Sequence, residues 1–408
     1  MSIAEAETQE AAPTFDKPFT QQEPIPEQAI ARAAEILRGG RLHRYNVLEG
    51  EEAEASLLER DYAAYQEARY CLACTSGGTA IQIALRAAGV RPGDAVLANA
   101  FTLAPVPGAM HAVGGRPVLV EIDENYVTDL DDLVRKAEAS GARFFLISHM
   151  RGHIADMDRV AEFCRARDIV LIEDCAHTMG ARWNGVRSGN HGRVACFSTQ
   201  TYKHLNSGEG GLLTTDDAEL AARAIVMSGS YMLYERHGMT PDAEVFERVK
   251  LDQPNLSSRM DNLRAAILRG QLPGLERNVA RWNALHDTLA EGLADCAGIR
   301  VPWRDPRESY VGSSFQFSLV NASTEVLRDF IARCGARGVE LKWFGAERPA
   351  GFTSRYDSWR YLGGQPDLPK TRAVLATLCD LRLPLTFDVE DAKLLVRIIR
   401  EEAEAKGR

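Results

Sequence analysis

Apolar positions between residues 70 and 173 form short runs that alternate with longer stretches of helical periodicity. The runs are apolar throughout, which is typical of strands that are buried on both faces. The longer stretches carry apolar residues three and four positions apart, as amphipathic helices do. We predict strands over 70–74, 95–99, 117–121, 144–148 and 169–173.

Helices are predicted between these strands, and strict alternation of this kind indicates a parallel α/β sheet with right-handed crossovers. Shorter strands over 194–198 and 211–214 extend the sheet. Two more helices, 27–38 and 51–67, precede it. The helices that connect the strands are expected over 79–88, 103–113, 130–139 and 157–167.

The pattern changes after about residue 270, where long helices over 275–293 and 389–405 flank short strands such as 314–320. This change predicts a smaller α+β domain. The irregular, mixed-charge stretch 231–255 is expected to be a loop near a functional site or an interface. We therefore predict three parts: a disordered tail over 1–17, a large α/β domain over 18–273 and a small C-terminal α+β domain over 274–408.

Composition narrows the class of protein. The net charge of −9 argues against nucleic acid as the main partner, because phosphate binding needs clustered Lys and Arg. No apolar run reaches the roughly 18–20 residues of a membrane span, and the acidic N-terminus lacks a signal-peptide pattern. The CxxC of Cys71 and Cys74 lies in an apolar run, which favours packing thiols over redox or metal chemistry. We expect a cytoplasmic protein without a metal.

The first candidate functional segment is Thr75-Ser76-Gly77-Gly78-Thr79, between a predicted buried strand and a helix. There the free backbone N–H groups and the positive end of the helix point to one spot, which can bind a phosphate. The alternative is a plain glycine-rich turn in which a Thr caps the helix.

The second segment ends an apolar strand with Asp174, followed three residues later by His177. The carboxyl ends of parallel strands are where α/β sheets bind ligands. A carboxylate there can keep a pyridine nitrogen protonated. For His177 the alternative is a satisfied core imidazole. Glu173 points the other way by strand alternation, so we expect it to be structural.

The third segment places Lys203 five residues after Ser198 and just before the glycine-rich turn 208–211. A Lys in a partly desolvated pocket has a lowered pKa and becomes a nucleophile for an aldehyde. The Ser198 hydroxyl can face a phosphate. The alternative is a solvated surface Lys, but the position of Asp174, 29 residues upstream, favours the chemical interpretation.

Together these segments resemble the DegT-type aminotransferases, which are fold-type I enzymes that use pyridoxal 5′-phosphate (PLP). The resemblance extends from about Gly40 to the Leu383-Pro384-Leu385 strand. Its motifs occur in the family's order: Arg69-Tyr70, Ser76-Gly77, Pro92-Gly93-Asp94, Ala100-Phe101-Thr102, Gly152 with Ala155-Asp156-Met157-Asp158, Glu173–His177, Gly180-Ala181, Phe197–Lys203 and Gly208–Gly211.

The resemblance implies the role of each matched residue. Lys203 forms the Schiff base with PLP, Asp174 pairs with the ring nitrogen, and His177 contacts the ring or its 3-hydroxyl. Ser198 and the backbone amides of Gly77 and Gly78 bind the phosphate. Relatives that remove a sugar hydroxyl instead carry His at the lysine position, so Lys203 argues against that branch.

The resemblance also implies a homodimer whose active site lies at the subunit interface, with Ser257–Arg259 reaching the neighbouring subunit's phosphate. The implied reaction is a ping-pong transfer of an amino group from an amino acid, glutamate or glutamine, to a keto sugar or cyclitol. A sensor that binds PLP or a sugar without turnover is the hypothesis from another class.

Several positions depart from the family pattern. Gly78 stands where the family often has Thr, so that side-chain phosphate contact is either lost or passed to Thr79. Leu103 replaces an aromatic residue that stacks on the cofactor, and Phe101 is the candidate substitute. Ser257 with Ser258 replaces Asn-Tyr.

Arg151 adds a positive charge near the expected substrate site, and Arg44 with the adjacent Tyr45 is a further substrate candidate. Because Arg can clamp a carboxylate with two hydrogen bonds, the alternative acceptor is a keto acid or another non-nucleotide carbonyl compound.

Overall fold

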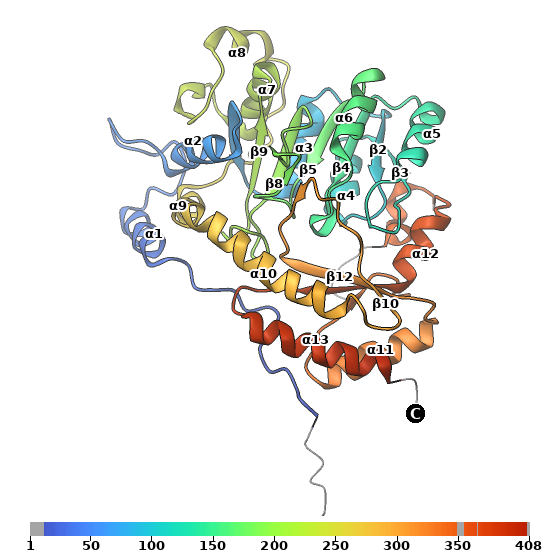
Figure 1. Ribbon diagram of the computed structural model, residues 1–408. Coiled ribbons are helices and arrows are strands. Elements are labelled where there is room, and N and C mark those ends of the chain that lie inside the picture. Colours follow the sequence, from blue (N-terminus) through green and yellow to red (C-terminus); the bar gives the residue numbers. More distant parts are fainter. Residues whose placement is uncertain (1–11, 349–354, 365, 406–408) are drawn as a thin grey trace, which may run out of the picture.

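The computed structural model describes residues 12–348, 355–364 and 366–405 (Figure 1). Its large sheet has seven strands in the order β1-β9-β8-β5-β4-β2-β3. Six strands are parallel, and β9 runs antiparallel to both of its neighbours. The strands lie where the sequence predicts them to within one residue: β1 (Tyr70–Cys74), β2 (Ala95–Asn99), β3 (Arg116–Val120), β4 (Phe144–Ser148), β5 (Val170–Asp174), β8 (Val194–Ser198) and β9 (Gly211–Thr215).

Helices surround this sheet, and polar side chains fix where several of them begin. The carboxylates of Asp129, Asp156 and Asp217 accept backbone N–H groups at the starts of α5, α6 and α7, which satisfies donors that no helical carbonyl can reach. Pro105 and Pro107 lie in the first turn of α4, where a missing N–H group costs no helical hydrogen bond. These helices are α3 (Gly77–Ala87), α4 (Pro105–Ala112), α5 (Leu130–Ser140), α6 (Met157–Ala166) and α7 (Ala218–Gly229).

Three further helices pack together beside β1: α1 (Glu27–Gly39), α2 (Glu54–Gln66) and α9 (Asn262–Gln271). The stretch 231–255, expected to be a loop, contains the short helices η2 (Tyr234–Arg236) and α8 (Ala243–Val249). The stacked rings of Tyr234 and Phe246 join these two helices.

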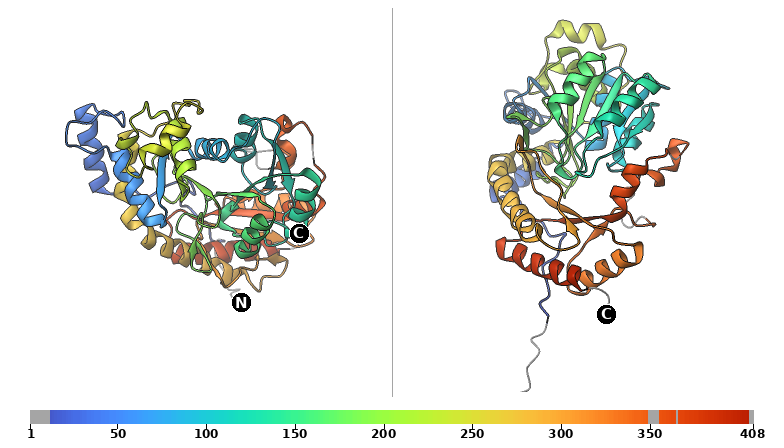
Figure 2. Two further views of the ribbon diagram at one scale, coloured as in Figure 1. Left: turned by 90° about the horizontal axis from the view of Figure 1, so that it is seen from above. Right: turned by 45° about the vertical axis from the view of Figure 1, so that its right-hand side comes forward.

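The small domain is built on a second sheet in the order β10-β12-β14-β13, which lies between the large sheet and helices α11 and α13 (Figures 1 and 2). Phe315, Phe317, Cys379 and Leu381 point to one face of it and pack in an apolar core with these helices. The elements are α10 (Leu275–Leu293), β10 (Ile299–Arg300), β12 (Ser314–Leu319), α11 (Thr324–Ala336), β13 (Lys342–Trp343), β14 (Leu378–Arg382) and α13 (Val389–Glu404).

The opposite face of the small sheet is polar and carries Ser314, Gln316, Asp380 and Arg382, because side chains alternate along each strand. This face looks toward the large domain, as shown by the 2.8 Å contact between His153 Nε2 and Gln316 Oε1. The remaining elements connect the two domains: η1 (Met150–Gly152), β6 (Arg182–Trp183), β7 (Val186–Arg187), η3 (Leu272–Gly274), β11 (Glu308–Ser309), η4 (Tyr356–Ser358), η5 (Arg360–Leu362) and α12 (Pro369–Thr377).

The N-terminal segment departs from the prediction. Residues 1–11 of the predicted disordered tail lie outside the described residues, but the structure orders residues 12–17. Phe15 and Phe19 are buried against Phe387, with ring centroids 4.9 and 5.1 Å away, and Phe15 N donates to Arg337 O. Residues 15–19 therefore pack on the small domain. The predicted boundary at residue 18 instead places residues 15–17 in the disordered tail and residues 18 and 19 in the large domain. Two isolated aromatic residues in a polar stretch gave no periodic signal of this docking.

Within the described ranges, no helix combines the length and the apolar character that a membrane span needs. All eight cysteines are buried and unpaired, in agreement with their prediction as packing thiols.

Replacing Phe19 with Ala tests the docking of the N-terminal segment. The side chain is 2% exposed, so its removal leaves a cavity and should lower the free energy of unfolding by about 3 kcal/mol. Urea denaturation measures this loss. Val326→Ala, at an α11 position that is 55% exposed, is the control and should leave the midpoint unchanged. A Phe19→Ala midpoint equal to that of wild type would contradict the packing.

Candidate active site

Lys203 lies in the loop after β8 and brings its amine to the imidazole of His177. Lys203 Nζ lies 2.8 Å from His177 Nε2. The pKa of Lys203 is lowered to about 7, chiefly by burial and also by the like charges of Arg151 and Arg382, while Asp174 opposes the shift. Burial and the Lys203 charge hold the pKa of His177 well below its ordinary value. A neutral imidazole therefore accepts a hydrogen bond from an amine that is partly uncharged, and hence nucleophilic, near neutral pH.

Asp174 ends β5 at the carboxyl edge of the large sheet, and a set of hydrogen bonds orients its carboxylate. Oδ2 accepts from Ser148 Oγ at 2.7 Å, and Oδ1 accepts from Ala176 N at 3.2 Å. Thr102 Oγ1 donates to Ser148 Oγ at 2.9 Å. Asn99 holds the backbone of Ser148 from both sides, since its Oδ1 accepts from Ser148 N and its Nδ2 donates to Ser148 O.

The sequence analysis missed this support for Asp174. A signal was present, because Asn99 and Ser148 are polar residues that end apolar strands. Such residues come together at one edge of a parallel sheet.

The turn between β1 and α3 has the geometry of an anion site. Ser76 caps the helix by accepting from Thr79 N at 3.1 Å, so Gly77 and Gly78 are the first helical residues, and their N–H groups have no acceptor within the helix. A Cβ added to Gly77 would lie 2.7 Å from Ser198 Cβ, so only glycine lets the end of β8 approach this turn. The Thr79 hydroxyl is engaged with Ser76 Oγ at 2.9 Å, within the cap.

These groups fit PLP in kind and in arrangement. The sheet order places β5 beside β8, while α3 contacts both β8 and β1. A phosphate site, a carboxylate and a buried amine therefore meet at one edge. This donor set matches a phosphorylated pyridine aldehyde, in which the ring nitrogen needs the carboxylate and the aldehyde needs the amine.

Arg151 is close enough to Lys203 for its charge to act on the amine. It lies in η1 with a left-handed backbone (φ 57°). Its Nη2 pairs with Asp380 Oδ2 of the small sheet at 2.7 Å. Since its charge lowers the pKa of Lys203, it is a neighbour of the reactive amine.

Arg44 and Tyr45 do not take the places predicted for them. Both guanidinium Nη atoms of Arg44 bind the carboxylate of Glu59 at 2.8 Å, and neither side chain has exposed surface. The Tyr45 hydroxyl lies 2.7 Å from His237 Nε2. Glu59 also accepts from Ala73 N of β1, so the cluster ties the loop before α2 to the sheet. The prediction that Arg44 binds substrate is therefore wrong, because its charge is already neutralised inside the protein.

Phe101 does not replace the missing stacking ring at Leu103. It is fully buried, and it contacts Phe344 and Tyr126 edge-on at 5.0 and 6.2 Å. A ring without exposed surface in a ligand-free chain has no face to offer a cofactor. Phe101 therefore serves the apolar core.

Ser257 is exposed and adopts a left-handed backbone (φ 51°). Arg259 Nη2 donates to its hydroxyl at 2.9 Å, and Thr75 N donates to the carbonyl of Ser258 at 3.0 Å. The segment is therefore anchored beside the phosphate turn of its own chain. Its contact with a neighbouring subunit remains a prediction.

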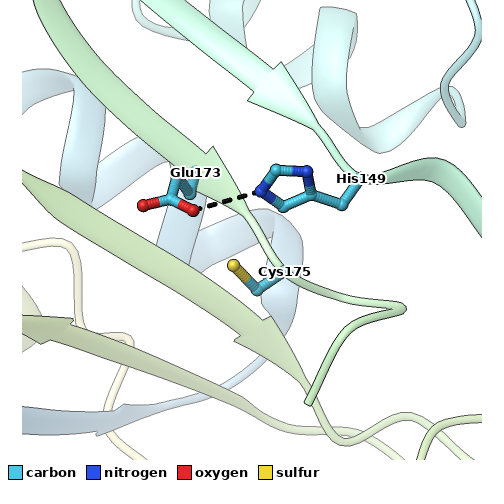
Figure 3. Close-up of side chains that lie close together, drawn as sticks. All are labelled: His149, Glu173 and Cys175. Atoms are coloured by element: carbon cyan, nitrogen blue, oxygen red, sulfur yellow. Dashed lines mark hydrogen bonds and ion pairs between the residues drawn. The ribbon is translucent and has the colours of Figure 1, made fainter. Parts of the chain in front are cut away.

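Behind the candidate site, His149, Glu173 and Cys175 form a buried group with metal-ligand atoms within 4.8 Å of one another (Figure 3). Glu173 points away from Asp174, as predicted. Burial raises its pKa, but the hydrogen bond and charge of His149 outweigh this and leave the pKa lowered. Its carboxylate oxygens accept from the backbone of Gly189 and His191 at 2.9 Å, which indicates a structural role.

The proteins that this chain resembles include several aminotransferases. Residues 25–400 match the model of the DegT/DnrJ/EryC1/StrS aminotransferase family. The dTDP-3-amino-3,4,6-trideoxy-alpha-D-glucose transaminase of Streptomyces venezuelae is 33% identical over 313 residues, covering 76% of each chain. The pleiotropic regulatory protein of Geobacillus stearothermophilus is 35% identical, but the match spans only 54% of this chain and 56% of the relative.

Solved structures agree. DesV of S. venezuelae, in complex with a ketimine intermediate, superposes with a TM-score of 0.77 at 28% identity, over 92% of this chain and 94% of that one. The aminotransferase TlmJ of Streptoalloteichus hindustanus has a TM-score of 0.81 at 21% identity, over 95% of this chain and 99% of that one. The fold is that of fold-type I PLP-dependent transferases, as predicted. The chain belongs to the DegT/DnrJ/EryC1/StrS aminotransferase family.

The reactivity of Lys203 in cofactor-free protein tests the electrostatics of the site. Competitive reductive methylation followed by mass spectrometry should give Lys203 a midpoint near pH 7. Arg151→Gln should raise this midpoint because it removes a positive neighbour, and Asp174→Asn should lower it because it removes the opposing negative charge. The exposed Lys393 is the internal reference for reagent reactivity. A Lys203 midpoint near 10 would show that the amine is not desolvated.

Proposed function

We propose that this protein is a PLP-dependent aminotransferase that moves an amino group from an amino acid, glutamate or glutamine, to a keto sugar or cyclitol. The observation that carries the proposal is the buried Lys203 amine beside His177, at the sheet edge that also holds Asp174. The acceptor class follows the names of relatives, such as the L-glutamine:2-deoxy-scyllo-inosose aminotransferase of Streptomyces kanamyceticus, which is 31% identical over 67% of this chain.

We assign PLP to this edge with a role for each group. Ser198, Thr79 and the N–H groups of Gly77 and Gly78 would hold the phosphate, and Ser257 of a neighbouring subunit would complete that site. Asp174 would pair with the ring nitrogen, and His177 would contact the ring or its 3-hydroxyl.

When bound, PLP would supply an electron-accepting ring and an aldehyde within reach of the Lys203 amine. The chain supplies proton transfer and orientation. Lys203 Nζ accepts the proton from the donor's α-carbon and delivers it again within the site, which requires an amine whose pKa lies near the working pH. His177 Nε2, 2.8 Å away, orients that amine. Ser148 and Ala176 N hold the Asp174 carboxylate in place.

The half-reaction with an amino donor tests the function directly. Protein loaded with PLP should absorb in the near-ultraviolet to visible range, and L-glutamate or L-glutamine should shift that band. Lys203→Ala should lose the band, whereas Lys393→Ala, which removes an exposed lysine of α13, should keep both band and shift. A band that no amino donor shifts would instead favour a sensor. Persistence of the same band in Lys203→Ala would exclude Lys203 as the attachment point.

We further propose a cytoplasmic homodimer. Eight buried cysteines without disulfides support a reducing compartment. The segment 231–256 exposes large apolar side chains, including Tyr231 (59% exposed), Met232 (55%) and Leu251 (85%). Neighbouring exposed apolar side chains of this kind favour a protein interface.

An introduced charge tests the dimer. Leu251→Glu should shift the protein toward monomers in sedimentation velocity, because a buried unpaired carboxylate is costly at an interface. Val326→Glu on α11, at a side chain that is 55% exposed in the small domain, is the matched control and should leave the mass unchanged. An unchanged mass for Leu251→Glu would place the interface elsewhere.

A further inference from the structure

The polar face of the small sheet carries a row of charged residues. In the strand register, Asp380 of β14 pairs with Gln316 of β12 on one side and with Lys342 of β13 on the other. Arg382, two residues after Asp380, points to the same face because side chains alternate along a strand. The face therefore carries two cations and one carboxylate, and it looks toward the large domain (Figure 1).

Arg151 of the large domain completes the group. Its Nη2 reaches Asp380 Oδ2 at 2.7 Å, and its guanidinium lies 5.9 Å from the ring centroid of Phe344. Lys342 Nζ lies 4.3 Å from the centre of the same ring. The guanidinium of Arg382 stacks at 3.8 Å on the ring of Tyr202, which directly precedes Lys203 in the chain. Three cations from three elements thus lie around Asp380 and Phe344, and two of them, Arg151 and Arg382, are near enough to Lys203 to lower its pKa.

The three cations repel one another. Burial, together with the charges of Arg151 and Arg382, lowers the pKa of Lys342 to about 7, although Asp380 opposes this. Burial and Arg151 also lower the pKa of Arg382. Arg151 Nε is buried and has no hydrogen-bond partner among the described residues. Buried cations that repel one another cost stability unless an anion joins them, so the group is suited to bind one.

We propose that Arg151, Lys342 and Arg382 form a binding site for a substrate carboxylate. Arg presents two parallel N–H groups to a carboxylate, and Lys adds a point charge. The inference rests on the proposed function, because it assumes that the substrate reacts at Lys203. The carboxylate has two sources: it belongs either to the amino-acid donor or to the acceptor.

Succinate, a dicarboxylate that cannot react with an amine, is the probe. Isothermal calorimetry on PLP-loaded wild-type protein should show saturable binding. Arg382→Gln and Lys342→Gln should each weaken this binding at least about tenfold, because each removes a charged hydrogen-bond partner. Arg382→Lys should recover part of the affinity. Lys393→Gln carries the same loss of charge on the exposed face of α13 and should bind as wild type does.

Two outcomes overturn the proposal: no saturable succinate binding to wild type, or unweakened binding in both variants while cofactor absorbance and melting temperature match wild type. If Arg382→Gln melts at a lower temperature than wild type, Arg382→Lys is the deciding variant. Restored folding without restored succinate affinity in Arg382→Lys counts against the site.

The glutamate half-reaction separates the two sources. If Arg382→Gln raises the half-saturating glutamate concentration about as much as it weakens succinate binding, the site binds the carboxylate of the donor. If the half-saturating glutamate concentration is unchanged while succinate binding is weakened, the site binds the carboxylate of an acceptor. If no amino donor shifts the wild-type band but succinate still binds through these residues, the carboxylate site stands and the proposed transamination fails.

Discussion

The burial of Lys203 beside His177 is the constraint on which the site depends, because burial sets the protonation state of the reactive amine. A lysine in water is charged at neutral pH and does not attack an aldehyde. Here burial, reinforced by the positive charges of Arg151 and Arg382, lowers the pKa to about 7. Arg382 belongs to the small sheet, so the reactivity of a lysine in the large domain depends on the docking of the two domains.

Asp174 illustrates how the sheet supports this chemistry. Its carboxylate accepts hydrogen bonds from Ser148 and Ala176, and Thr102 in turn holds Ser148. Each of these residues follows or ends a strand of the same parallel sheet. Strand register alone brings them together, which is why a site built this way is rigid before any ligand arrives.

The large sheet could be predicted from the sequence because its strands are continuous apolar runs separated by amphipathic helices, each with a local signal. Lys203, Asp174 and His177 were found because short motifs carry them. Lys342 and Arg382 were missed, since a two-residue strand and a single charged residue at a strand end have no pattern in sequence. Arg44 was misjudged because nothing local reveals that Glu59 neutralises it. Contacts between segments distant in the chain decide such cases.

The same contrast bears on the substrate. The residues proposed to hold the cofactor lie on the large sheet, whereas two of the three charges of the proposed carboxylate site, Lys342 and Arg382, come from the small sheet. A polyhydroxylated acceptor needs hydrogen-bond donors and acceptors but no cluster of cations. Arg151, Lys342 and Arg382 share Asp380 as a neighbour, and the pKa of Lys342 falls to about 7 through burial and through repulsion by the charges of Arg151 and Arg382. An incoming carboxylate would relieve that repulsion next to the reactive amine, so the binding of an acidic substrate and the protonation of Lys203 are electrostatically coupled. A neutral sugar would leave the repulsion in place.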